Sequence, residues 1–370
     1  MILTFPCFSA ASIRLAPVRI GEQWGYLNTR GEFAIPIQYD MADYFSENLA
    51  LVRVRNKYGY IDASGKWKIT PRFENAGNFV EGLAKVNVDQ KWGFISPQGD
   101  WRLSPNYDEV FDFDHGVAFV KQGEMWGVIR KNGELILDPT MNAVEPFAEN
   151  LAAVRMNWKS GFINRQGAIV IPFRYEEAGS FHHGLAPAKE NGQWGWIDPS
   201  GQWVIPPATY NQVTVFSEPA AGVKQGDKWG FIRKDGEWLA VPQFDEIADF
   251  QQGFAYALQD GITGLLDTQG RFHPYPDLGM ILPYREGLAG AVRNSDNLGG
   301  YINLQGRFVI SPRFEDVTDF ENGIAVVRKN EKWGYINKQG QYLFKKRFDE
   351  AWLFQLVSAT HPREFYIINP

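Results

Sequence analysis

A glycine recurs along this chain at intervals of 34 to 36 residues, and this period constrains the fold more than any other feature of the sequence. Tryptophan precedes six of the ten glycines and tyrosine a seventh. The ten positions are Gly25, Gly59, Gly93, Gly127, Gly161, Gly195, Gly230, Gly264, Gly300 and Gly334. A fixed period of this length indicates a repeat protein, in which each copy is one small unit that packs on its neighbours.

Other columns keep the same period and predict the local structure of each copy. Ala84, Val86 and Val88 alternate as one face of a β-strand does, and Lys91–Ile95 predicts the next strand. A second glycine six residues after each anchor, such as Gly99, predicts a hairpin turn that needs a positive φ. A third strand follows, with proline at or next to its end in nine copies, where it is expected to stop the ladder. The chain is therefore expected to be all-β, built from three-stranded antiparallel meanders.

Two columns of apolar residues are candidates for packing between copies. An alanine precedes each anchor by nine residues, or by eleven in the ninth copy, and is expected where adjacent sheets press closest. A further position is aromatic in every copy. The two columns are Ala16, Ala50, Ala84, Ala118, Ala152, Ala186, Ala221, Ala255, Ala289 and Ala325, and Phe45, Phe79, Phe113, Phe147, Phe181, Phe216, Phe250, Tyr284, Phe320 and Phe354.

The architecture expected from these units is an open β-superhelix in which the copies stack as in a solenoid. A closed β-propeller is the alternative. Propeller blades usually have four strands, and no sequence shared between the two ends suggests closure, although the chain begins and ends within a unit. The expected domains are an N-terminal edge segment or cap at 1–14, ten repeats at 15–354 with an irregular region at 260–300, and a degenerate eleventh repeat or C-terminal cap at 355–370.

The strand motifs resemble a known family. Lys91–Ile95, Lys228–Ile232 and Lys332–Asn337 are similar to the "KWGYIN" core of bacterial WG-repeat proteins, as are the companion segments Val170–Pro172 and Phe79–Ala84. The resemblance spans about Leu15 to Phe354. It implies a β-repeat architecture, a bacterial origin and a role in interaction rather than a defined catalytic activity. Copies eight and nine depart from the core motif, which makes 260–300 the expected bend or specialised surface, with the two-residue insertion at Asn294–Asn297 as a surface loop.

Composition argues against several function classes. A net charge of −6 does not suit phosphate binding, so no nucleic-acid partner is expected. Cys7 is the only cysteine, which excludes an internal disulfide and a cysteine-based zinc site. No stretch approaches the roughly 18 apolar residues of a membrane span. Met1–Ala11 is apolar but lacks a positively charged beginning, so it is interpreted as an edge segment, with a cleaved signal as the alternative. The expected location is the cytoplasm.

The chain shows no convergent catalytic set, and no enzyme, cofactor or metal is expected. The five histidines are His115, His182, His183, His273 and His361. His115 and His183 precede the glycine of a turn and are interpreted as exposed turn residues rather than metal ligands or bases.

Two charged columns are candidates for a binding surface. A basic residue lies three positions after the column alanine in seven copies: Arg19, Arg53, Lys121, Arg155, Lys189, Lys224 and Arg328. An acidic residue follows an aromatic one in seven copies: Asp40, Glu74, Asp108, Glu176, Asp245, Glu315 and Asp349. Both columns are interpreted as facing solvent or pairing between strands. The functional alternative is a basic ladder for an extended acidic partner.

A column of large apolar residues on the third strand offers a second surface. Its members are Phe33, Trp67, Trp101, Leu135, Ile169, Trp203, Trp238, Phe272, Phe308 and Tyr342. Burial between copies is the expectation, and exposure would favour stacking on sugar rings. The function predicted overall is a non-catalytic scaffold for a protein or peptide partner, with binding of carbohydrate or cell-envelope glycan as the alternative.

Overall fold

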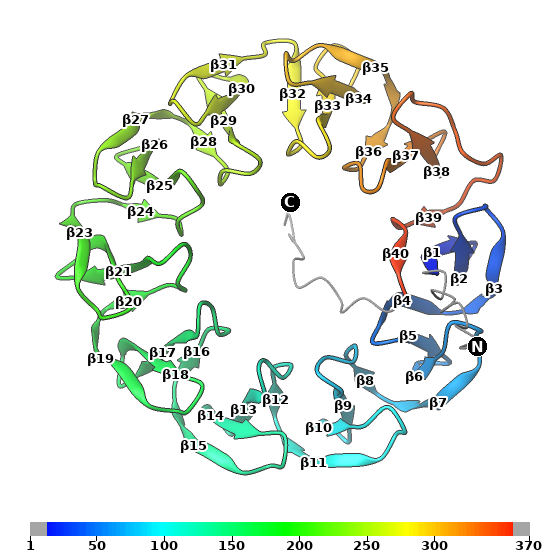
Figure 1. Ribbon diagram of the computed structural model, residues 1–370, viewed down its shortest axis with the longest axis horizontal. Coiled ribbons are helices and arrows are strands. Elements are labelled where there is room, and N and C mark those ends of the chain that lie inside the picture. Colours follow the sequence, from blue (N-terminus) through cyan, green and yellow to red (C-terminus); the bar gives the residue numbers. More distant parts are fainter. Residues whose placement is uncertain (1–12, 358–370) are drawn as a thin grey trace, which may run out of the picture. The chain divides into compact units, whose positions relative to one another are not determined.

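The computed structural model describes residues 13–357, and every regular element in that range is a β-strand (Figure 1). The chain divides into two compact units, one that ends at Pro105 and resumes at Lys346, and one that spans Asn106–Lys345. No helix in residues 13–357 is long and apolar enough to cross a membrane. The expected N-terminal cap and the eleventh repeat at Phe365–Asn369 fall largely or wholly outside the described residues.

The second sheet shows the pattern that most copies follow. It consists of β4 (Met41–Ser46), β5 (Leu49–Val54), β6 (Lys57–Ile61) and β7 (Trp67–Phe73), paired antiparallel in that order. The expectation of three strands was wrong, because the connecting stretch of the preceding copy supplies a fourth. In most sheets this strand has only two residues, too short to show an alternating pattern in the sequence.

The sheets are numbered in the order in which their anchor glycines occur along the chain. In the first unit, the first sheet contains β1 (Arg14–Ile20), β2 (Gln23–Asn28), β3 (Phe33–Tyr39), β39 (Glu350–Ala351) and β40 (Gln355–Leu356), and the third contains β8 (Asn75–Ala76), β9 (Ala84–Val88), β10 (Lys91–Ile95) and β11 (Trp101–Tyr107).

The second unit holds the fourth to tenth sheets. The fourth sheet contains β12 (Glu109–Val110), β13 (Val117–Gln122), β14 (Met125–Arg130) and β15 (Leu135–Met141), the fifth contains β16 (Ala143–Val144), β17 (Leu151–Met156), β18 (Lys159–Asn164) and β19 (Ile169–Tyr175), and the sixth contains β20 (Glu177–Ala178), β21 (Ala186–Glu190), β22 (Gln193–Ile197) and β23 (Trp203–Ala208). The seventh sheet contains β24 (Gln212–Val213), β25 (Ala220–Gln225), β26 (Lys228–Arg233) and β27 (Trp238–Phe244), and the eighth contains β28 (Glu246–Ile247), β29 (Phe254–Gln259), β30 (Ile262–Asp267) and β31 (Phe272–Pro274). The ninth sheet contains β32 (Leu278–Ile281), β33 (Leu288–Arg293), β34 (Leu298–Asn303) and β35 (Phe308–Phe314), and the tenth contains β36 (Asp316–Val317), β37 (Ile324–Lys329) and β38 (Lys332–Asn337).

The anchor glycine is required by a bulge in the outer strand of the sheet, which is β7 in the second sheet. Tyr58 pairs with Phe73 and Tyr60 with Ile69, so β7 carries two extra residues opposite Gly59. A Cβ on Gly59 would lie 2.6 Å from the Ile69 carbonyl oxygen and 2.7 Å from the Pro71 nitrogen. Pro71 therefore lies within the strand at the bulge, and the expectation that this proline ends the strand was wrong. A bulge leaves residues out of the ladder, so proline loses no hydrogen bond there.

The two apolar columns form the core of the sheets. All ten column alanines are buried, which confirms their assignment to tight packing. The aromatic column is also buried, with Phe147 the half-buried exception. Phe79 lies edge-to-face against Tyr60 at a centroid distance of 4.8 Å. The turn glycines have positive φ, as expected, and Gly65 is a typical case at 80°.

The first sheet is built from both ends of the described chain. Strand β1 pairs antiparallel with β39 and β40, with Arg19 opposite Glu350. The Asp349 N–H donates to the Arg19 carbonyl oxygen at 2.9 Å, as the Asp40 N–H does to that of Arg53 at 2.9 Å in the second sheet. The last copy therefore supplies to the first sheet the strand that each copy supplies to the next.

This pairing overturns the expected open superhelix. An open stack would leave the edge of β1 without a strand, whereas here β39 and β40 complete the first of the ten sheets, as the last strands of a closed β-propeller do. The sequence concealed the closure because the closing segments, Glu350–Ala351 and Gln355–Leu356, have two residues each and carry no distinctive motif.

Candidate partner-binding sites

The basic column lies on the second strand of each sheet, and four of its seven members form ion pairs with the short first strand. Their carboxylate partners come one position after the acidic column rather than from it, although Arg328 also lies near Glu315 at 3.5 Å. The pairs are Arg19–Glu350 at 3.1 Å, Lys121–Glu109 at 2.7 Å, Lys189–Glu177 at 2.9 Å and Arg328–Asp316 at 2.9 Å. These cations are engaged in joining strands, in line with the structural interpretation of the column.

The other three basic residues have no ion pair within residues 13–357. Like the ion-paired Lys121, Lys189 and Arg328, they lie over aromatic rings. The contacts are Arg53 over Tyr58 at 5.9 Å, Arg155 over Trp158 at 5.5 Å and Lys224 over Trp229 at 5.7 Å. The Nε atoms of Arg53 and Arg155 are buried without a hydrogen-bond partner among the described residues. If the basic column binds an acidic partner, these three residues are its best candidates.

The acidic column fixes hairpin turns. The Asp40 carboxylate accepts a hydrogen bond from the Arg55 N–H at 2.6 Å, and Asp349 accepts one from the Gly21 N–H at 2.8 Å. Glu176, Asp245 and Glu315 accept equivalent bonds. The turns at Arg55–Asn56 and its equivalents have positive φ at both central residues, so their N–H groups point away from the ladder toward these carboxylates. This role was not predicted from the sequence.

The large apolar column is neither fully buried nor fully exposed. Trp67 and Trp101 are 39% and 42% exposed, and Trp203 and Trp238 are partly buried. Each ring packs edge-to-face on an aromatic residue of the preceding copy, as Trp67 does on Tyr39 at 5.9 Å. Part of each tryptophan ring thus packs against the preceding copy, and part of its remaining surface is exposed to solvent.

The eighth and ninth copies contain a large open pocket. Strand β31 has three residues where β7 has seven, and an open cavity of about 410 Å³ lies beside it. The inserted residues Asn294–Asn297 form an exposed turn, as expected. The cavity is lined by Gly253, Phe254, Asp267, Thr268, Gln269, Arg271, His273, Tyr275 and Leu304.

A buried carboxylate organises the polar side of this pocket. Asp267 is 8% exposed, and its Oδ2 accepts hydrogen bonds from Arg271 Nε at 2.8 Å and from His273 Nε2 at 2.9 Å. Burial by itself would raise the pKa of Asp267. The hydrogen bonds from His273 and Arg271 and from backbone N–H groups outweigh it, so the pKa of this carboxyl is well below its usual range. Asp267 therefore stays ionised and holds the side chains of Arg271 and His273 at the pocket.

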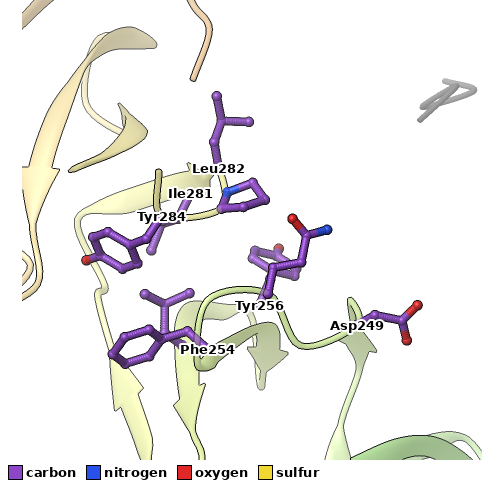
Figure 2. A pocket seen from close by; sticks show the side chains of 9 residues that line it. Asp249, Phe254, Tyr256, Ile281, Leu282 and Tyr284 are labelled. Atoms are coloured by element: carbon purple, nitrogen blue, oxygen red, sulfur yellow. The ribbon is translucent and has the colours of Figure 1, made fainter. Parts of the chain in front are cut away.

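An apolar pocket of about 30 Å³ adjoins this region, with Phe254 common to both (Figure 2). Phe254 and Tyr284 approach each other with a centroid distance of 5.4 Å, and Ile281 and Leu265 also line the space. Asp249 lies at its margin, where burial raises the pKa of the carboxyl. This pocket is too small for a drug-sized ligand.

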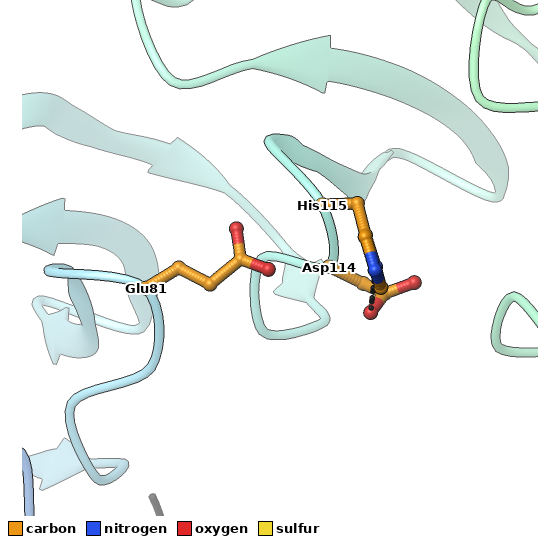
Figure 3. A group of neighbouring side chains, drawn as sticks. All are labelled: Glu81, Asp114 and His115. Carbon is orange, nitrogen blue, oxygen red and sulfur yellow. Dashed lines mark hydrogen bonds and ion pairs between the residues drawn. The ribbon is translucent and has the colours of Figure 1, made fainter.

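The turn histidines lie where the sequence placed them. His115 and His183 have φ of 50° and 52° directly before glycine, and their side chains are 72% and 47% exposed. His115 Nδ1 lies 3.0 Å from an oxygen of Asp114, as the dashed line in Figure 3 marks. His273, to which the sequence analysis assigns no role, lines the large pocket. His361 falls outside the described residues.

The residues around Asp267 were not singled out from the sequence, although the region was. The signal lay in the departures from the repeat: Thr263 in place of tryptophan, and an acidic turn residue followed at short distance by both arginine and histidine. A second departure, Ser160 in the fifth copy, lines a separate pocket.

A family model described as "WG containing repeat" matches nine segments of the chain: 24–58, 58–92, 92–126, 126–159, 161–194, 194–229, 229–261, 300–333 and 333–355. The chain belongs to the WG-repeat family. Residues 262–299 lie between two matched segments, so the part of this WG-repeat protein that departs from the family model supplies most of the residues that line the large pocket.

Among the solved structures that match, one resembles the WG-repeat array in fold alone. A crystal structure of a eukaryotic initiation factor matches with a TM-score of 0.56 at 10% identity, over 93% of this chain and 98% of that one. Dihydro-heme d1 dehydrogenase NirN gives a TM-score of 0.41 at 10% identity, over 96% of this chain and 78% of its own. Hsv2p of Kluyveromyces lactis gives 0.35 at 11% identity, over 62% and 92%. No curated protein matches the sequence.

Proposed function

We propose that this WG-repeat protein is a non-catalytic scaffold that binds a protein or peptide partner, and that the pocket of copies eight and nine is its main contact. The observation that carries the proposal is the 410 Å³ pocket in the segment that departs from the repeat. The proposal places the protein in the cytoplasm, which cell fractionation would test.

The chemistry of the pocket suits a side chain that accepts hydrogen bonds. Arg271 is 70% exposed and His273 is 43% exposed, so both can reach a partner while Asp267 holds them from behind. Phe254 and Tyr275 supply apolar surface beside them. A few oriented polar groups on an apolar wall are typical of a binding pocket, and the surrounding sheets give it a rigid frame. A carboxylate or backbone carbonyl of an extended peptide would satisfy Arg271 and His273.

The test begins with a partner identified by copurification and cross-linking, whose affinity is then measured by calorimetry with purified components. Arg271→Glu should weaken binding by about tenfold or more, because it reverses the charge that faces the partner. Arg307→Glu is the matched control, since Arg307 is exposed and follows the turn glycine of copy nine as Arg271 does in copy eight. Equal affinity of the Arg271 variant and the control would contradict the proposal.

The basic column provides a second test of the same proposal. Charge reversal at Arg53 and Arg155 should weaken a partner that uses the column. Reversal at Lys189 should have less effect, since Lys189 is bridged to Glu177 at 2.9 Å. Retained affinity in all three variants would remove the column from the binding surface.

A glycan-binding function is the second candidate, and exposed tryptophans favour it. Trp67 and Trp101 occupy equivalent places on β7 and β11 and are each about two-fifths exposed. Aromatic faces of this kind stack on sugar rings. A glycan array tests this function, and hits that disappear in Trp67→Ala with Trp101→Ala would replace the peptide proposal.

A further inference from the structure

The fifth sheet contains a pocket of about 200 Å³ that the repeat pattern does not predict. It lies where β16, β17 and β18 meet β20 of the sixth sheet, and it is lined on one side by Glu145, Ala153 and Ser160. Ser160 is the residue that stands in place of the tryptophan before the anchor glycine.

One repeat earlier, the same three positions hold aromatic rings. Phe111, Phe119 and Trp126 lie 34 residues before Glu145, Ala153 and Ser160, respectively. The rings of Phe111 and Trp126 are 5.1 Å apart, and those of Phe111 and Phe119 are 5.8 Å apart, both edge-to-face. The pocket of the fifth sheet is therefore the space that an aromatic cluster fills in the fourth.

The cation above this space has also lost its usual partners. In the fourth sheet Lys121 pairs with Glu109 at 2.7 Å and lies 5.8 Å from the ring of Trp126. In the fifth sheet the residue opposite Arg155 is Ala143, and Arg155 lines the pocket with its Nε buried and unpartnered among the described residues. A cation next to an empty ring position is a ready partner for an aromatic face.

The charges of the lining select against simple ions. Glu145 disfavours an anion and Arg155 disfavours a cation, while Glu177 is already paired with Lys189 at 2.9 Å. Partial burial raises the pKa of Glu145, so a neutral guest suits this site better than a second negative charge does. A neutral ring that presents its face to Arg155 and an N–H donor to a carboxylate meets all three conditions, and indole has both features.

We propose that this pocket binds the indole side chain of a tryptophan in a partner peptide. This inference rests on the proposed scaffold function and adds a second contact to it, on a different sheet from the large pocket. The volume is sufficient, because cavities of about 150 Å³ accept a benzene ring. The exposed Trp158 also contacts Arg155, whose guanidinium carbon lies 5.5 Å from the ring centroid, so it offers a further aromatic surface beside the cation.

The experiment uses N-acetyl-L-tryptophanamide as the probe and the full-length protein, with binding followed by calorimetry and by NMR of the alanine methyl groups. Ser160→Trp restores the family residue and fills the pocket, so the affinity of this variant for the probe should be at least about tenfold lower than that of the parent. Ser160→Ala leaves the pocket open and should bind like the parent. Ala153→Phe blocks the pocket with the ring found at Phe119, and it serves if Ser160→Trp does not fold.

Binding by the parent and by Ser160→Ala, with loss in Ser160→Trp or Ala153→Phe, would support the inference. No binding by the parent, equal binding of the filled variants, or equal binding of N-acetyl-L-leucinamide would overturn it. The probe is a single amino-acid derivative and needs no protein partner. Failure of the partner experiments at Arg271 can therefore be distinguished from failure of this site.

Discussion

The second and eighth sheets are built from equivalent segments of the repeat but use them differently. In the second sheet a seven-residue outer strand bulges over Gly59, and Tyr60, Ile69 and Phe73 are buried. In the eighth sheet the outer strand has three residues, and Asp267, Arg271 and His273 gather beside an open pocket. Where the repeat pattern is kept, its residues are used for packing. Where it is lost, space and polar groups become available to a partner.

The largest expected effect comes from adding a Cβ to an anchor glycine. In Gly93→Ala the new atom would lie 2.5 Å from the Leu103 carbonyl oxygen, and backbone cannot easily move within a regular sheet. We expect a loss of about 3 kcal/mol in the free energy of unfolding. In Gly264→Ala of the eighth sheet the new atom would lie 2.6 Å from the His273 carbonyl oxygen and against the ring of Phe272. The cost should still be smaller, because the outer strand there has only three residues and can move more easily. Urea unfolding of both variants tests this, and an equal or larger loss in Gly264→Ala would break the comparison.

Asp267→Asn should separate the turn role of this residue from its role in the pocket. Asparagine occupies the equivalent turn position at Asn303, where its side chain accepts the same backbone hydrogen bonds. The variant therefore loses mainly the charged contacts with Arg271 and His273. We expect a cost of about 1–3 kcal/mol at neutral pH.

The pH dependence of that cost has a definite sign. Hydrogen bonds lower the folded-state pKa of Asp267, so its contribution is present above the unfolded value of about 3.9 and is lost as pH falls through the folded value. The difference in stability between the parent and Asp267→Asn should shrink in acid. A difference that stays constant from pH 7 down to the limit of the folded state would contradict this account.

The acidic column offers a comparison between a regular and an irregular copy. Asp40→Ala removes the carboxylate that accepts from the Arg55 N–H, and we expect a loss of about 1 kcal/mol. In copy nine the main-chain carbonyl of Asp277 accepts the corresponding bond from the Asn294 N–H at 2.9 Å. Asp277→Ala should therefore change thermal stability very little, and a loss equal to that of Asp40→Ala would show that its side chain has a role the structure does not explain.

The smallest effect is expected for the ion pairs of the basic column. A double-mutant cycle with Lys189→Ala and Glu177→Ala should give a coupling of about 0.2–1 kcal/mol that declines with salt, since both side chains are partly exposed. Lys224 faces Gln212 rather than a carboxylate, so the cycle with Lys224→Ala and Gln212→Ala should give less. Coupling that is larger at Lys224 would refute the assignment of the column to strand pairing.

Much of the fold could be predicted because the same residue pattern recurs in ten copies. The buried alanines, the turn glycines and the strands around Gly93 follow from alternation and turn chemistry alone. The fourth strand and the closure could not be predicted, because a two-residue strand such as Asn75–Ala76 is specified by its neighbours rather than by its own sequence. The bulge at the proline could not be predicted for a related reason, because it depends on pairing across the sheet.

The candidate sites were predictable in location but not in composition. The loss of tryptophan at Thr263 and Ser160 marks both pockets, yet only copies eight and nine were expected to be specialised. Asp267 could not be linked to His273 without knowing that β31 turns back beside β30. The basic column was visible as a pattern, but its ion pairs with residues such as Glu109 depend on the register of a strand too short to predict.

The shared first sheet also bears on how the protein is made. Arg19 and its partner Glu350 are separated by 331 residues, so β1 leaves the ribosome long before the strands that complete its sheet. During that interval β1 presents an unpaired edge to other chains, and such edges are sites of aggregation and domain exchange. A chaperone could shield this edge, or two nascent chains could exchange β39 and β40, only while the intervening sheets are being translated.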